Sequence, residues 1–92
     1  MSRLASLTPP QGWSAALVAH GRVLADQLRR SHVADADLHA ALCRAGLGGV
    51  EQAACVIMEA SGHLSVIRAG VPIDPALLAG VVGAERVLGP TD

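Results

Sequence analysis

The sequence predicts an α+β fold, a small mixed or antiparallel sheet of two hairpins packed against one main helix and shorter helices. Short apolar runs occur in pairs around glycine-containing turns, and residues 35–45 have the spacing of an amphipathic helix. The length of the chain is consistent with such a fold, because 92 residues suit one domain that buries about two thirds of the surface exposed in the unfolded chain. Trp13 is the only aromatic residue, so the core must be aliphatic.

The first hairpin is predicted from two short apolar segments, residues 15–19 and residues 22–24. His20-Gly21 stands between them, and Gly21 supplies the positive φ that a tight turn needs. One or two helical turns are expected to follow at residues 26–30.

The main helix is predicted at residues 35–45. Asp35 and Asp37 favour its N-terminus, and Leu38 lies one turn before Leu42 on a single face. Gly46 is placed to end the helix. Alanine precedes the helix where serine or threonine would cap better, so we expect Asp35 to take the capping role.

The second hairpin is predicted from a buried strand at residues 53–58, a turn at Gly62 and a returning strand at residues 64–68. We expect the two strands to pair antiparallel. Side chains alternate between the faces of a sheet, so Ser65 should face away from Leu64.

The remaining chain flanks this unit of residues 13–70. Residues 1–12 are expected to be an N-terminal lead-in, because adjacent prolines there cannot lie inside a helix. Residues 71–92 form a C-terminal extension, with Asp74 as a cap before Pro75. A short helix weakened by glycine is predicted at residues 76–82.

Composition disfavours several classes of protein. Net charge is −1 and aromatic stacking platforms are missing, which disfavours nucleic-acid binding, although an arginine patch assembled in three dimensions stays open. No apolar run reaches the roughly 18 residues of a membrane helix, so we expect a soluble chain that does not insert into a membrane. Cys43 and Cys55 are interpreted as buried, reduced residues of a cytosolic protein.

The turn of the second hairpin carries the strongest candidate for chemistry. Glu59 and Ser65 flank it and resemble a base and a nucleophile, but His63 lies in the turn and no nucleophile elbow is present. We therefore predict no catalytic residue. We expect the Glu59 carboxylate to accept backbone N–H groups of residues 61–63, and Ser65 to hydrogen-bond within the hairpin.

Metal and cofactor sites are not predicted. The four histidines lack the spacing of zinc ligands, and the two cysteines form no C-x-x-C pair. The glycine-rich stretch at residues 46–49 follows a helix and lacks the lysine of a phosphate-binding loop. We interpret it as a helix end followed by a connector.

An ordered series of motifs runs with constant spacing over about residues 13–68. Its matching positions are Gly21 in the first turn, Asp37, Leu38, Arg44 and Gly46 in the main helix, and Glu59, Gly62 and Ser65 in the second hairpin. The series resembles the soluble C-terminal domain of the YetF/YcaP family of bacterial membrane proteins. In that family the helix ends Leu-Arg-x-x-Gly, a pattern that Cys43 interrupts here.

The resemblance implies a cytosolic α/β domain that follows transmembrane helices in a longer parent protein, and it brings no established activity. We expect a non-catalytic module for self-association or regulation at the cytoplasmic face of the membrane. Its expected partners are further copies, paired through a sheet edge, and the transmembrane helices of its own parent. Two alternatives stay open: a small-molecule sensor with a polar pocket near Glu59, Ser65 and Arg44, and a stand-alone soluble protein.

Overall fold

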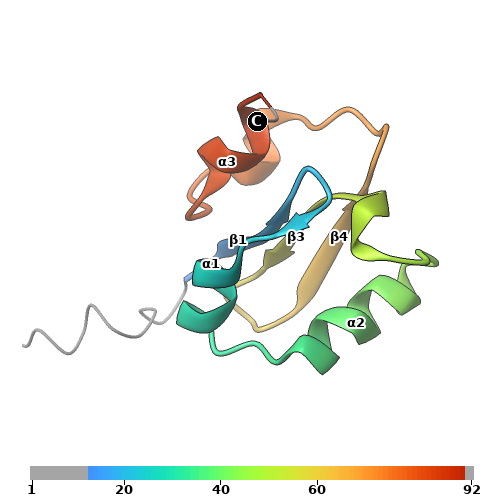
Figure 1. The fold of residues 1–92 in the computed structure, drawn as a ribbon. Helices are drawn as coiled ribbons and strands as arrows, with labels where there is room; N and C mark the ends of the chain where they lie inside the picture. Colours follow the sequence, from blue (N-terminus) through green and yellow to red (C-terminus); the bar gives the residue numbers. More distant parts are fainter. Residues whose placement is uncertain (1–12, 91–92) are drawn as a thin grey trace, which may run out of the picture.

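A computed structural model describes residues 13–90 (Figure 1). The predicted lead-in at residues 1–12 lies outside this range, as do residues 91–92 of the expected extension. In chain order, the elements are β1 (Ala15–Ala19), β2 (Arg22–Val23), α1 (Ala25–Arg30), α2 (Asp35–Arg44), the 3-10 helix η2 (Val50–Gln52), β3 (Ala53–Met58), β4 (Leu64–Arg68), the 3-10 helix η3 (Pro75–Leu78) and α3 (Ala84–Leu88).

The four strands form one sheet in the order β2-β1-β3-β4, and each neighbouring pair is antiparallel. Both predicted hairpins are confirmed, and β1 joins them by pairing with β3 at the centre of the sheet. Val18 pairs with Val23 on one side and with Val56 on the other, so apolar residues continue across three strands. The predicted α+β class is confirmed, with an antiparallel sheet.

The turn of the first hairpin needs two left-handed residues. His20 has φ 52° and Gly21 has φ 77°, which is the conformation of the tight turn that matches the twist of paired strands. Space also matters at Gly21, because an added Cβ would lie 3.0 Å from the carbonyl oxygen of Glu51. The turn thus packs directly against the backbone of η2.

Helix α2 begins and ends close to the predicted residues, but its N-terminus is capped differently. Ala34 is the N-cap residue and no side chain caps the helix, so the prediction for Asp35 is wrong. The carbonyl of Ala34 accepts the first intrahelical bonds, and the two aspartates lie in the first turn, where the helix dipole favours negative charge. At the other end Gly46 has φ 79°, and Leu47 N donates to Leu42 O at 3.0 Å, which completes a Schellman motif.

The sheet has a hydrophobic core on each face. On one face, α1 and α2 contribute Leu28, Leu38 and Leu42 to a cluster with Leu17 and Val56. On the other, the C-terminal segment contributes Leu78 and Val87 to a second cluster, together with Ala16, Ala19, Leu24, Cys55 and Ile57. Figure 1 shows the sheet between α2 and the segment that carries α3.

The C-terminal segment differs from its prediction. The helix expected at residues 76–82 is wrong: η3 makes a single turn and α3 begins only after Gly83. Gly80 and Gly83 both adopt positive φ, which ends one helix and starts the next. The predicted cap is confirmed, since Asp74 Oδ1 accepts from Ala76 N at 3.0 Å.

Residues 81–83 instead lie alongside β1. Ala16 N donates to Val82 O at 2.9 Å, and Val82 N donates to Ser14 O at 2.8 Å. The resulting parallel bridge joins Val82 to Ala15, where β2 is too short to pair. The C-terminal segment therefore covers both a face of the sheet and part of the outer side of β1.

Candidate functional site

Glu59 and Ser65 meet across the second hairpin. The Ser65 hydroxyl donates a hydrogen bond to the Glu59 carboxylate, which confirms the predicted bond within the hairpin. The prediction that this carboxylate accepts backbone N–H groups of the turn is wrong. Gly62 N instead donates to the carbonyl oxygen of Glu59 at 2.7 Å, and His63 N donates to Ser61 Oγ at 3.4 Å.

This pair has the geometry of a structural contact. The partner of the Ser65 hydroxyl is the exposed carboxylate of the residue that follows β3, and within residues 13–90 no imidazole hydrogen-bonds to this pair. A serine nucleophile needs an orienting base and donors for an oxyanion. What the contact can do is hold the turn closed.

Arg44 lies on the opposite side of the sheet from this pair. Leu64 and Val66 pack against the cluster under α2, whereas Ile67, which shares a face with Ser65, packs against the C-terminal cluster. The polar pocket expected near Glu59, Ser65 and Arg44 is therefore not formed, because β4 directs Ser65 away from α2.

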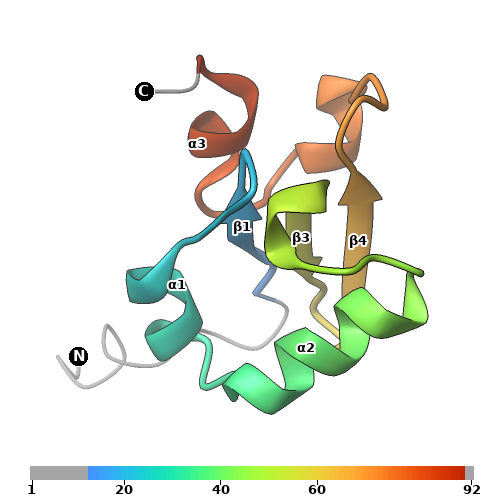
Figure 2. The ribbon, with the colours of Figure 1, turned by 45° about the vertical axis from the view of Figure 1, so that its right-hand side comes forward.

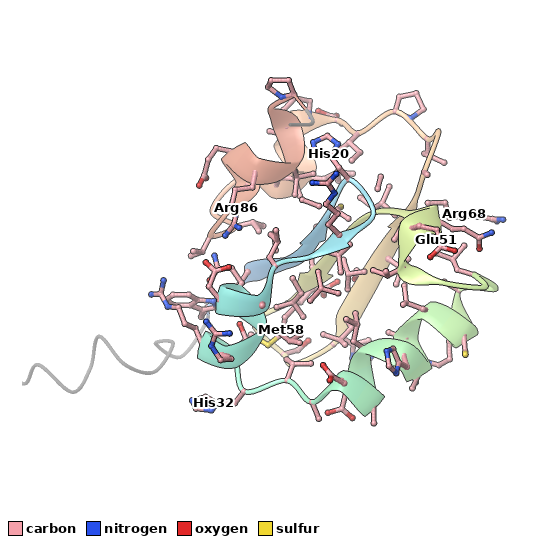
Figure 3. All side chains as sticks on the ribbon, viewed as in Figure 1. His20, His32, Glu51, Met58, Arg68 and Arg86 are labelled. Atoms are coloured by element: carbon pink, nitrogen blue, oxygen red, sulfur yellow. The ribbon has the colours of Figure 1, made fainter. Side chains whose placement is uncertain are left out.

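Arg44 instead lines a cleft of about 400 Å³ between α2, the α1–α2 connection and the second hairpin. Asp37, Met58 and His63 also line it, so the cleft carries charges of both signs. His32 belongs to its rim with φ 57°, but its ring points away from the body of the molecule (Figure 3).

The other positions of the motif series serve the fold. Leu38 is in the core and Gly46 ends α2. Gly21 and Gly62 hold the two turns with φ 77° and 91°. Asp37 is exposed in the first turn of α2.

Histidine and cysteine form no cluster in the described part of the chain. Across residues 13–90, no three side chains among His, Cys, Asp and Glu are grouped so as to hold a metal ion. His20 Nε2 hydrogen-bonds to Gly89 O at 2.8 Å and ties the first turn to the end of α3. Cys55 is buried, and burial raises the pKa of its thiol. Cys43 is exposed, so its predicted burial is wrong: it lies on the flank of α2 away from the core.

The outer edge of β4 is the main uncovered backbone of the sheet. Glu59 N donates to His63 O, and Ala69 N donates to Gln52 O, both at 2.8 Å. In an antiparallel strand, every second residue directs its N–H and C=O groups toward the neighbouring strand. Because His63 and Ala69 bond to the β3 side, Ser65 and Ile67 also bond to β3, and the N–H and C=O groups of Leu64 and Val66 point away from the sheet. Figure 2 shows β4 as the strand on the side of the sheet away from β1.

A polar flank of α2 borders the cleft that Arg44 lines, and sequence reasoning missed it. Asp37, Ala40 and Arg44 line the cleft together with Leu64, and all three are exposed. Their i, i+3, i+7 spacing places them on one side of the helix. The opposite flank, with His39 and Cys43, faces Val23 of β2 across a separate apolar groove. The spacing was visible in the sequence, but not which flank borders the cleft.

Comparison with known proteins gives no relative: no protein-family model, curated protein or solved structure matches this chain. Among residues 13–90, none of the helices has the length and apolar character needed to cross a membrane.

Proposed function

We propose that this chain is a non-catalytic module through which a bacterial integral membrane protein self-associates or is regulated on its cytoplasmic side. The membrane part of the proposal rests on the motif series that resembles the YetF/YcaP C-terminal domain. In a full-length parent, transmembrane helices of the same chain would be its neighbours.

The observation that carries self-association is the uncovered edge of β4. This strand has five residues, and its one charge, Arg68, lies at the end beside Glu51 (Figure 3). Proteins usually protect such an edge with charge, proline or a covering segment. The other side of the sheet has this protection, because β2 has only two residues and Val82 bonds to β1 beyond it.

Sedimentation velocity of the 92-residue chain, measured up to millimolar concentration, tests self-association. We expect the average mass to rise with concentration to that of a small oligomer. Val66→Pro should lower this tendency while preserving the fold, because it removes an N–H that points to solvent rather than to β3. A chain that stays monomeric throughout would refute self-association.

Fractionation of the source cells, probed with an antibody to this domain, tests the membrane part. A band much heavier than 9.3 kDa in the membrane fraction is expected. A band near 9.3 kDa in the soluble fraction would instead support a stand-alone protein.

A second candidate function is sensing of a small acidic molecule in the cleft beside α2. Its support is the cleft of about 400 Å³ with Arg44 on its wall, and within residues 13–90 this guanidinium has no ion pair. A ligand that binds only the folded state raises the melting temperature. A screen of small carboxylates and phosphates should then give a shift that Arg44→Ala abolishes; no shift with any of them would remove this candidate.

A further inference from the structure

We propose that the face formed by Trp13, Arg29 and Arg30 docks onto the anionic headgroups of a lipid bilayer. This inference rests on the proposed location beside a membrane, and it names the surface of the domain that meets the lipid. Such a contact would hold the domain in one orientation, in addition to any covalent link to a membrane-spanning part.

Trp13 contacts α1 through Arg30. The guanidinium carbon of Arg30 lies 5.2 Å from the centre of the indole ring, within the range of a cation–π interaction. Trp13 is partly exposed and lies just before β1, against which α1 packs. The ring and the guanidinium therefore belong to one surface, at the end of the sheet where β1 begins (Figure 1).

The charge of this surface is positive. Arg29 and Arg30 occupy the last turn of α1, both are exposed, and neither forms an ion pair within residues 13–90. Asp26, one turn before them, is neutralised by Arg86 of α3 at 2.9 Å. The helix dipole favours basic residues at this end of α1, but it does not account for the stacking of one of them on the only aromatic ring of the chain.

These residue types select a lipid surface as the partner. Tryptophan is enriched at membrane–water interfaces, and anionic lipids attract basic side chains near the surface. Proteins that bind single-stranded nucleic acid stack bases on several aromatic rings, whereas this chain has one aromatic residue. The face also lies away from the open edge of β4, so a lipid surface and a second copy can bind together (Figures 1 and 2).

Vesicle sedimentation of the full 92-residue chain tests the lipid contact. We expect binding to vesicles of equimolar phosphatidylcholine and phosphatidylglycerol at low ionic strength, and weaker binding as salt is added. Arg29→Gln and Arg30→Gln should each lower the partition coefficient about fivefold, the contribution of one basic residue near an anionic surface. Arg22→Gln, the same change beside the other end of β1, should alter it little.

The fluorescence of Trp13 tests which face makes the contact. Trp13 is the only tryptophan and the chain has no tyrosine, so the emission reports on this face alone. On anionic vesicles we expect the emission to shift to shorter wavelength and to be quenched by brominated phosphatidylcholine, because the ring enters the interfacial region. Vesicle binding without either change would overturn the proposal, since the chain would then dock through another face.

The outcomes separate this face from the proposed function. No binding to the anionic vesicles, equal binding to phosphatidylcholine alone, or an equal loss with Arg22→Gln would refute the lipid contact. Self-association in sedimentation and a heavier band in the membrane fraction would not be affected by those results. A single-stranded oligonucleotide that binds through Arg29 and Arg30, with no vesicle binding, would also refute the contact and assign this face to nucleic acid. Circular dichroism of the three variants should match the wild type, because all three arginines are exposed.

Discussion

Glu59 and Ser65 show how a single polar contact follows from the geometry of a strand. Ser65 of β4 lies opposite Ile57 of β3, and Glu59 follows Ile57 by two residues, just after the end of β3. A diagonal neighbour at this offset lies within reach of a long side chain, so the carboxylate can accept the hydroxyl hydrogen. Gly62 N donates to the carbonyl oxygen of Glu59 and His63 N donates to Ser61 Oγ, so neither amide uses the carboxylate that accepts from Ser65.

Removing this contact should destabilise the hairpin modestly. We expect Ser65→Ala and Glu59→Ala each to lower the free energy of unfolding by roughly 1 kcal/mol or less, since the bond is partly exposed to water. The double variant should cost little more than either single change, because both remove the same bond. Urea denaturation gives these values. Additive losses would show that the residues stabilise the fold independently.

Two glycines that end elements have different surroundings. Gly21 and Gly46 have nearly equal φ, 77° and 79°. A Cβ at Gly46 would meet nothing within 4 Å, whereas one at Gly21 would crowd the Glu51 backbone at 3.0 Å. A substitution at Gly46 therefore tests only the backbone conformation that the helix end requires. A substitution at Gly21 also tests the packing of the β1–β2 turn on η2.

Alanine at these positions separates the two effects. Gly46→Ala should cost about 1–2 kcal/mol, the penalty of a left-handed conformation for a residue with a Cβ. Gly21→Ala should cost clearly more, because the backbone of η2 must also shift. Thermal or urea unfolding of both variants provides the comparison. Equal losses would mean that the turn relaxes freely away from η2.

At the scale of the whole molecule, the C-terminal segment is fastened to the rest by contacts distant in sequence. Arg86 of α3 forms an ion pair with Asp26 of α1 at 2.9 Å. Desolvation acts to raise the pKa of Asp26, but the hydrogen bond and charge of Arg86, together with hydrogen bonds from backbone N–H groups, hold that pKa below its ordinary value. His20 and Gly89 add a second tie, and Leu78 and Val87 the apolar contact.

This ion pair predicts a small dependence of stability on pH. A carboxyl whose pKa is lower in the folded state stabilises the fold above its unfolded pKa, and that contribution is lost as pH falls through the folded pKa. Asp26→Asn should therefore reduce stability at neutral pH by at most about 1 kcal/mol, because the pair is half exposed. The difference from wild type should vanish in acid and shrink in high salt. A pH-independent difference would contradict this assignment.

The sequence by itself determined the strands, the main helix and the fold class. Apolar runs, the spacing of Leu38 and Leu42, and glycines at the turns predicted the four strands, α2 and the α+β class, because these signals act between residues close in the chain. A hydrogen bond of Ser65 within its hairpin could be predicted for the same reason, since a short hairpin brings its own strands together, but its partner, Glu59, could not.

Only the tertiary structure decided which strands are neighbours and which side chains share a face. The pairing of β1 with β3 sets which strands are edges, and the face that β4 turns to α2 separates Arg44 from Ser65. The rotation of α2 leaves Cys43 exposed, and bonding to β1 draws residues 81–83 out of the predicted helix. These features depend on contacts between residues far apart in the chain. A local sequence pattern carries no information on the energies of such contacts. The open edge of β4, which carries the proposed function, belongs to this group.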